Sequence, residues 1–274
     1  KYQQRANSWM LMVASFGFVI STLPVQILLP MIGWRSIFLL ISILILLSII
    51  LILVFTPSWN NNPKNTTTQE KGNLSDVWKN KFFISLIPLC FLNYGGVQAV
   101  QTLWAGPWML NVAGYSPLDS ATGLFWINIT MLFAFMFWGY ILPKFSSLGI
   151  DSIKIVKIGL PISYVVLFSI IIMGQDAGAI MFTLYILSSI VLSLTQPALA
   201  LSFPQNLAGK SLTSINVFIH SGTFFVQWGI GLLIDLSKNM GASTVTSYKI
   251  SFSIFLILCI FSYLFFIYFN KNEN

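Results

Sequence analysis

Long apolar runs are the feature that most constrains how this chain folds. A bilayer core about 30 Å thick is crossed by a helix of about 20 apolar residues. Eight runs have this length, and we expect each to form one membrane span: Trp9–Met31, Ser36–Phe55, Phe82–Leu110, Ser120–Leu142, Ile153–Met173, Ala179–Phe203, Leu212–Leu236 and Ile250–Phe269. The sequence therefore predicts an all-α, polytopic transmembrane helical bundle with eight spans.

The composition excludes a soluble globular domain. Only 8% of the residues are charged and 56% are hydrophobic, whereas soluble domains average roughly 25% charged residues. The net charge of +7 does not indicate nucleic acid binding, because the basic residues are scattered through the gaps between apolar runs, as in membrane proteins. We expect a lipid bilayer as a partner and no nucleic acid.

One connection between the apolar runs is much longer than the others. Residues 57–81 contain Asn60-Asn61-Asn62-Pro63 and Thr66-Thr67-Thr68 together with several ionisable residues. This composition is typical of a flexible, solvated linker. We therefore expect two helices in residues 1–56, a linker at 57–81, and six helices in residues 82–274.

The distribution of Lys and Arg predicts the orientation in the membrane. If the amino end is cytoplasmic, eleven of these residues fall in cytoplasmic segments and three fall outside, namely Arg35, Lys238 and Lys249. Cytoplasmic loops are the ones enriched in Lys and Arg. We expect a multi-pass protein of the cell (inner) membrane, with the amino end of this chain, the linker and the carboxyl terminus all cytoplasmic.

Three of the eight runs are apolar on nearly every side, and they recur at every third position: 36–55, 153–173 and 250–269. Uniformly apolar helices tolerate lipid on most sides, whereas polar side chains at membrane depth face a cavity or another helix. The period of three is typical of triple-helix repeats that each place one helix at the periphery.

The other runs carry polar and aromatic side chains that are candidate solute contacts. At 100° per residue, the side chains of each group below fall within a sector of about 60–80° on their helix, with Gln98 at the margin of its group. The candidate substrate-binding residues are Asn93, Gln98, Gln101, Trp104 and Trp108 in 82–110, Tyr185, Ser189 and Gln196 in 179–203, and Asn216, His220 and Gln227 in 212–236.

Two interpretations of these stripes remain. Amides donate and accept hydrogen bonds, so a wall of amides binds a polar solute without fixing one charge. The alternative is hydrogen bonding between helices, worth about 0.6 kcal/mol per pair. Ser193 and Thr223 lie on the same stripes, and Asn128 is the amide of the fourth run. We expect Gly95-Gly96 and Gly229-Ile230-Gly231 to serve close helix contact or bending rather than ligand contact.

The sequence contains no arrangement typical of an enzyme or a metal site. His220 has no second His or Cys at ligand spacing, and the acidic residues lie unpaired in loops or near helix ends. There is no glycine-rich phosphate loop and no nucleophile elbow. We therefore expect no enzymatic activity, no metal and no cofactor.

Three segments carry a resemblance to the major facilitator superfamily of transporters. Gly33-Trp34-Arg35-Ser36-Ile37-Phe38 resembles the family's junction between its fifth and sixth helices, and Gln101–Trp108 is similar to the end of its seventh. Pro204–Asp235 resembles the tenth loop and the eleventh helix. The resemblance implies two six-helix halves joined by a cytoplasmic linker, with this chain covering helices five to twelve. Four amino-terminal helices of the same protein would then be missing, which agrees with Lys1 in place of Met.

The resemblance implies secondary active transport of a small polar or amphipathic organic solute by alternating access, as a symporter or antiporter driven by a proton or solute gradient. The alternative is a membrane scaffold or subunit that does not transport. A channel is disfavoured because no ring of like charges and no symmetric filter sequence is present.

His220 has two interpretations. Histidine is the side chain that changes its charge near neutral pH, so His220 is a candidate for coupling protons to transport. The alternative is a neutral imidazole that hydrogen-bonds Asn216 or a water molecule.

Overall fold

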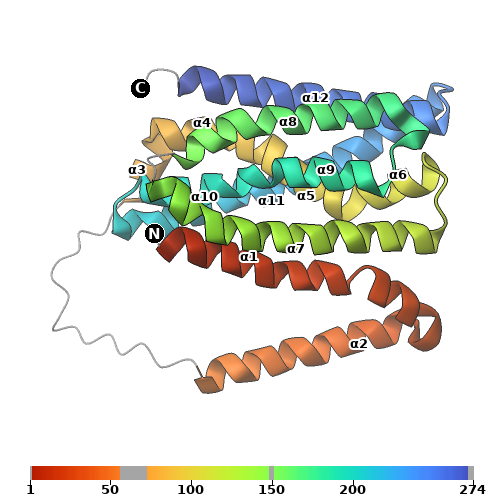
Figure 1. The fold of residues 1–274 in the computed structure, drawn as a ribbon, viewed down its shortest axis with the longest axis horizontal. Coiled ribbons are helices and arrows are strands. Elements are labelled where there is room, and N and C mark those ends of the chain that lie inside the picture. Colours follow the sequence, from red (N-terminus) through yellow and green to blue (C-terminus); the bar gives the residue numbers. More distant parts are fainter. Residues whose placement is uncertain (1, 56–72, 148–150, 271–274) are drawn as a thin grey trace.

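The computed structural model describes residues 2–55, 73–147 and 151–270, and among these residues it contains helices and no strand (Figure 1). Seven helical segments in this part of the chain are long and apolar enough to cross a membrane. The predicted all-α transmembrane bundle is confirmed, and the count of eight spans is approximate.

The bundle consists of an α1–α2 hairpin and a six-span body. The hairpin is formed by α1 (Tyr2–Ile20) and α2 (Leu23–Phe55). The first span of the body, called here the α4–α6 span, joins α4 (Lys81–Leu89), α5 (Gly95–Ala99) and α6 (Ala105–Asn111) through π-helical turns at Cys90–Tyr94 and Val100–Trp104. The others are α7 (Pro117–Ser147), α8 (Ser152–Met173), α9 (Ala179–Ser189) continuing through a 3-10 turn at Ile190–Leu194 into α10 (Thr195–Leu201), α11 (Gln205–Asn239) and α12 (Thr244–Phe269).

The first expected span, Trp9–Met31, is interrupted after Ile20 and so is not one continuous helix. Pro24 has no N–H to donate to the carbonyl four residues earlier, which removes a helical hydrogen bond at this point. The hydroxyls of Ser21 and Thr22 donate to carbonyls of the preceding turn, at 2.9 and 2.8 Å. These local bonds compete with the helical ladder, and α1 ends here.

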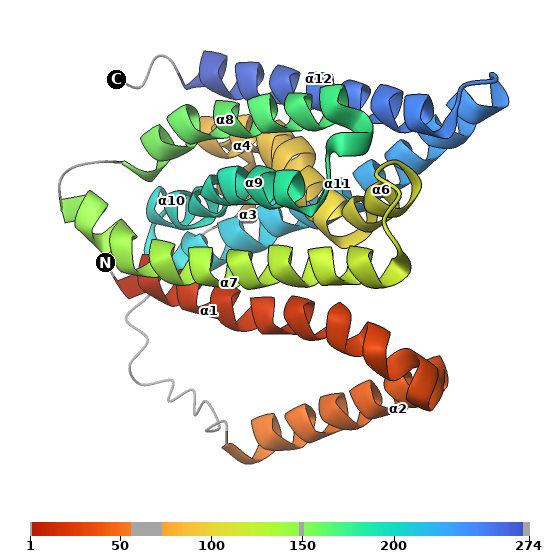
Figure 2. The ribbon, with the colours of Figure 1, turned by 45° about the vertical axis from the view of Figure 1, so that its right-hand side comes forward.

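The boundary expected between the first two spans is present as a bend inside α2. Gly33 has φ of +73° and ψ of 159°, a conformation that glycine adopts without steric cost. Beyond this bend the chain turns back along the bundle and diverges from α1 (Figures 1 and 2). No residue of α2 is buried.

Of the three uniformly apolar runs, the one in α2 has no buried residue, whereas those in α8 and α12 contribute side chains to the buried core. α8 and α12 pack together on the side of the bundle opposite α1 and α2 (Figures 1 and 2). Between these two sides lie the α4–α6 span, α9, α10 and α11, which contribute most of the buried core. The α1–α2 hairpin contacts the body chiefly through α1 and α7.

The end of the expected linker forms a short helix, α3 (Leu74–Lys79). Val77 is fully buried, and the ring of Trp78 packs edge-on against Phe83 of α4. Burial of Val77 and the contact between the Trp78 and Phe83 rings hold α3 against the body, so this part of 57–81 is a packed helix, whereas its composition predicts a flexible linker. Residues 56–72 lie outside the part of the chain described by the structure.

The glycines expected to allow close helix contact behave differently from one another. A Cβ at Gly95 would lie 2.6 Å from the carbonyl oxygen of Ile219, and one at Gly222 would overlap the backbone of Phe91. The α4–α6 span and α11 therefore touch backbone to backbone at this crossing. A Cβ at Gly229 would meet no atom within 4 Å, so Gly229 makes no such contact.

Candidate functional site

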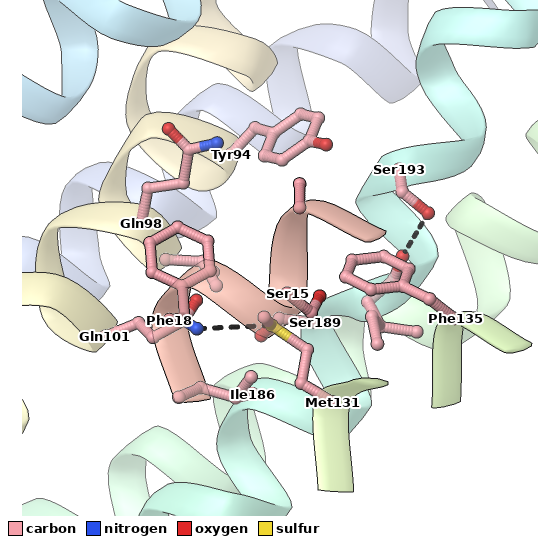
Figure 3. Close-up of a pocket in the computed structure, with 13 residues that line it drawn as sticks. Ser15, Phe18, Tyr94, Gln98, Gln101, Met131, Phe135, Ile186, Ser189 and Ser193 are labelled. Carbon is pink, nitrogen blue, oxygen red and sulfur yellow. Dashed lines mark hydrogen bonds between the residues drawn. The ribbon is translucent and has the colours of Figure 1, made fainter. Parts of the chain in front are cut away.

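Two cavities lie between the α1–α2 hairpin and the body. The larger, about 340 Å³, is called here the amide cavity and is lined by Ser21, Thr22, Gln26, Gln101, Thr102 and Asn128, among others. The smaller, about 80 Å³, is called the serine cavity and is lined by Ser15, Tyr94, Gln98, Gln101, Ser189 and Ser193, among others (Figure 3). Ligand pockets usually have volumes of about 300–1,000 Å³, so the amide cavity has room for a small organic solute.

The two cavities follow one another along the bundle axis. The amide cavity reaches Ala121, close to the beginning of α7, whereas the serine cavity reaches Phe135, further along the same helix. At 1.5 Å per residue these positions are about 21 Å apart. Phe18 and Gln101 line both cavities. These two side chains therefore form the partition between the cavities.

Hydrogen bonds at the partition join the α4–α6 span to α7 and α7 to α1. Gln101 Nε2 donates to Asn128 Oδ1 at 2.8 Å and to Met131 Sδ at 3.2 Å, both on α7. Asn128 Nδ2 in turn donates to the carbonyl oxygen of Phe18 on α1 at 3.4 Å. Gln101 and Asn128 are both buried. Figure 3 shows the Gln101 amide directed at Met131 beside the Phe18 ring.

Three of the predicted residues line the serine cavity: Gln98, Gln101 and Ser189. Ser189 and Ser193 donate their hydroxyl protons to carbonyls of their own helix, at 2.7 and 2.8 Å. Each of these hydroxyl oxygens can therefore still accept a hydrogen bond, but the hydroxyl has no further proton to donate. The structure thus brings together parts of two predicted stripes, from the α4–α6 span and from α9 with its 3-10 turn.

Other predicted residues join the α4–α6 span to α11 along a polar seam. Thr223 donates to Gln98 Oε1 at 3.1 Å, and Gln227 Nε2 donates to the hydroxyl of Thr102 at 2.9 Å. Trp104 Nε1 donates to the carbonyl oxygen of Gln227 at 3.1 Å. Of this seam, Gln98 faces the serine cavity and Thr102 faces the amide cavity.

The predicted residues nearer the α3 end of the bundle lie outside both cavities. Gln196 Nε2 donates to Asn216 Oδ1 at 2.8 Å, which joins α10 to α11. Asn216 therefore accepts its hydrogen bond from Gln196. The imidazole of His220 is exposed on α11 and lines neither cavity.

The last three predicted residues are buried inside the body. Asn93 donates to Ser262 Oγ at 2.7 Å and accepts from the hydroxyl of Tyr164 at 2.8 Å. Tyr185 is 3% exposed and belongs to the apolar core. Trp108 is completely buried. These side chains hold helices together at positions where neither cavity reaches them.

The residues that sequence reasoning missed lie mostly on α1 and the start of α2. Ser15, Thr22 and Gln26 are separated by seven and four residues, and all three line a cavity. On the continuous helix expected over Trp9–Met31 this spacing would place them on one face, which is the same signal used for the other stripes. Tyr94 was missed although it lies four residues before Gln98, on the same face.

We expect Asn93→Leu to destabilise the protein by about 1–3 kcal/mol and to leave solute affinity unchanged, because the Asn93 amide is surrounded by protein groups that would lose a buried partner. The measurement is the free energy of unfolding by SDS in mixed micelles, together with solute binding. Asn111→Leu is the control, since Asn111 is an exposed amide that also bonds a tyrosine. Loss of solute binding at unchanged stability would contradict a structural role for Asn93.

A comparison with known protein families matches residues 1–227 to the Major Facilitator Superfamily. A search of curated proteins found no match. The family match covers most of the chain, including the hairpin, both cavities and the polar seam. It agrees with the transmembrane helical fold and with the resemblance carried by the sequence. The chain belongs to the major facilitator superfamily.

Proposed function

We propose that this chain forms part of a secondary active transporter that moves a small polar or amphipathic organic solute by alternating access. The observation that carries the proposal is the pair of cavities arranged along the bundle axis, each lined by amides and hydroxyls among apolar side chains, with Phe18 and Gln101 between them. Membership in a family of membrane transporters supports the class of function. A scaffold has no need of amides and hydroxyls lining an internal space.

In this proposal the solute contacts Gln98, Gln101 and Ser189 in the serine cavity. In the amide cavity it contacts Gln26, Thr102 and Asn128. The remaining predicted residues lie outside the cavities: along the polar seam, within the core, in the bond between α10 and α11, or, for His220, exposed on α11. They are Asn93, Trp104, Trp108, Tyr185, Gln196, Asn216, His220 and Gln227.

The proposal includes four further helices of the same protein, which the family's plan places opposite the six-span body. One face of α11 supports this addition, because it exposes the imidazole of His220 together with Phe224, Phe225 and Trp228. A polar side chain directed at lipid is unfavourable, whereas a mixed polar and aromatic face suits packing against another helix.

The energy source in this proposal is a proton or solute gradient, used for symport or antiport. The sequence carries no phosphate-binding loop that would indicate nucleotide hydrolysis. Proton coupling would use His220, whose exposed position on α11 leaves it accessible to the proposed additional helices.

The test is uptake into proteoliposomes by the chain together with the proposed additional helices. Labelled polar solutes are offered under an imposed proton or solute gradient. Saturable uptake that collapses with the gradient supports transport. If the reconstituted, folded protein takes up no solute above empty liposomes, the scaffold interpretation replaces it.

The proposed topology predicts where a protease can act. We expect trypsin to cleave within residues 57–81 in inside-out vesicles and to leave this segment intact in right-side-out cells, because the segment holds Lys64, Lys71, Lys79 and Lys81 and few apolar residues. Immunoblotting of a carboxyl-terminal tag reports the cleavage. A cytoplasmic marker protein verifies that the cells stayed closed, and cleavage in such cells would overturn the proposed orientation.

A further inference from the structure

The described residues that line the two cavities are all uncharged. Among the residues that the structure places around them, none is Asp, Glu, Lys, Arg or His. Charged residues of the same helices, such as Asp119 and Lys144 on α7, lie near the helix ends. An ion moved into a low-dielectric site without a counter-charge loses its hydration and gains no compensating attraction. The lining therefore disfavours charged solutes.

Several polar atoms in the serine cavity have no hydrogen-bond partner among the described residues. Gln98 accepts through Oε1 from Thr223, which leaves its Nε2 donor unused. Gln101 donates through Nε2 to Asn128, which leaves its Oε1 acceptor unused. The hydroxyl of Tyr94 is a third such group. One donor, one acceptor and one hydroxyl together fit an uncharged solute that carries hydroxyl or amide groups.

The partition contains amide hydrogen bonds, and a solute with hydroxyl or amide groups can form hydrogen bonds of the same kind. The chain of bonds runs from Gln101 to Asn128 and on to the carbonyl of Phe18, and its last link of 3.4 Å is longer than an ordinary N–H···O bond. A hydroxyl or amide of the solute can accept from Gln101 and donate to Asn128. The bond between the two amides is then replaced by two bonds to the solute, whereas an apolar solute would leave both amides unpaired.

The volumes place the solute on one side of the partition. The amide cavity, at about 340 Å³, accommodates a small organic molecule, and the serine cavity, at about 80 Å³, does not in this conformation. Gln26 lines the amide cavity, and its side-chain amide has no partner among the described residues. The solute therefore first occupies the amide cavity, against Gln26 and Asn128.

We propose that the site selects small uncharged solutes bearing hydroxyl or amide groups, and that Gln101 admits them by exchanging its hydrogen bond to Asn128 for bonds to the solute. This inference rests on the proposed transport function and adds to it the chemical class of the solute and the residue that selects it. Phe18, which lines both cavities beside Gln101, completes the partition.

The test is a binding series of four probes with one carbon skeleton: sorbitol and gluconamide, which are uncharged, gluconate, which is an anion, and glucamine, which is a cation at pH 7. Equilibrium dialysis of the whole 274-residue chain in detergent micelles gives the dissociation constant of each probe. We expect at least one uncharged probe to bind at least tenfold more tightly than either charged probe. Failure of both uncharged probes to bind saturably, or equal or tighter binding of a charged probe, would overturn the proposal.

Variants test the role of Gln101 separately. Gln101→Leu is expected to weaken binding of the uncharged probe at least tenfold, and Gln101→Glu to turn the preference toward glucamine, because a carboxylate then faces the cavity. Asn111→Asp is the control, since it introduces the same charge on α6 outside both cavities and is expected to leave the preference unchanged. A Gln101→Glu variant whose thermal unfolding matches that of the unmodified protein, and which still keeps the original preference, would contradict selection by Gln101.

The binding test and the transport test can fail independently of each other. Selective binding without gradient-driven uptake would refute the transport function and leave the uncharged solute site standing. Uptake without preference for uncharged probes would refute this inference and leave transport standing.

Discussion

Gly222→Ala is expected to destabilise the protein by about 3 kcal/mol, at the upper end of the range for overpacked cores. A Cβ at this position would overlap the carbonyl group and Cα of Phe91. These are backbone atoms, which cannot move aside by a change of rotamer, so the α4–α6 span and α11 would have to separate. Their separation would also disturb the polar seam, in which Gln98, Thr102 and Gln227 take part.

The measurement for Gly222→Ala is SDS-induced unfolding in mixed micelles, followed by near-ultraviolet circular dichroism. Gly229→Ala, on the same helix, is the matched control because a Cβ there meets no atom within 4 Å. We expect it to stabilise the protein by up to about 1 kcal/mol through the higher helix propensity of alanine. Equal effects of the two substitutions would mean that the crossing at Gly222 is not a close backbone contact.

Helix positions in the body could be predicted from the sequence because each apolar run there is bounded by turn residues. The expected span Ile153–Met173 corresponds to α8 (Ser152–Met173), and Ala179–Phe203 corresponds to α9 and α10 together. Membrane thickness fixes the length of such runs, so hydropathy alone locates them.

Features that depend on local or tertiary hydrogen bonding could not be predicted in this way. The break after Ile20 results from Pro24 acting together with two hydroxyls that bond back to the preceding turn. The short helix α3 forms within a polar segment because Val77 and Trp78 pack against the body. Hydropathy averages over about 20 residues and does not resolve either effect.

The candidate site was predictable only as a set of helical faces. Spacing along one helix indicates that Gln98 and Gln101 share a face, but it does not give the rotation of that helix relative to its neighbours. Gln196 and Asn216 look equally suitable in the sequence, yet they bond to each other outside both cavities. The pairing of amides across helices is a tertiary property, and it separates solute contacts from structural ones.

Trp108 shows the same difference between structural residues and solute contacts, and its substitution is expected to have a large effect on stability. The sequence placed it among the candidate solute contacts, whereas the structure buries it completely, with its ring 4.8 Å from that of Phe252 and 6.0 Å from those of Phe182 and Tyr248. We expect Trp108→Ala to destabilise the protein by about 3–5 kcal/mol, the usual cost of removing a large buried aromatic side chain. Trp126→Ala is the control, since that ring is mostly exposed and its loss should change stability by no more than about 0.5 kcal/mol.

Trp108→Phe distinguishes the ring from its polar atom. Trp108 Nε1 is buried and has no hydrogen-bond partner among the described residues. Removing an unpaired donor relieves a desolvation cost of about 1–3 kcal/mol, which offsets much of the packing lost with the smaller ring. We therefore expect the free energy of unfolding of Trp108→Phe to lie within about 1 kcal/mol of that of the unmodified protein. We also expect the variant to bind the uncharged probe equally well. If Trp108→Phe instead abolished probe binding while stability was unchanged, Nε1 would be a solute donor, and the buried ring would belong to the binding site after a rearrangement of α6.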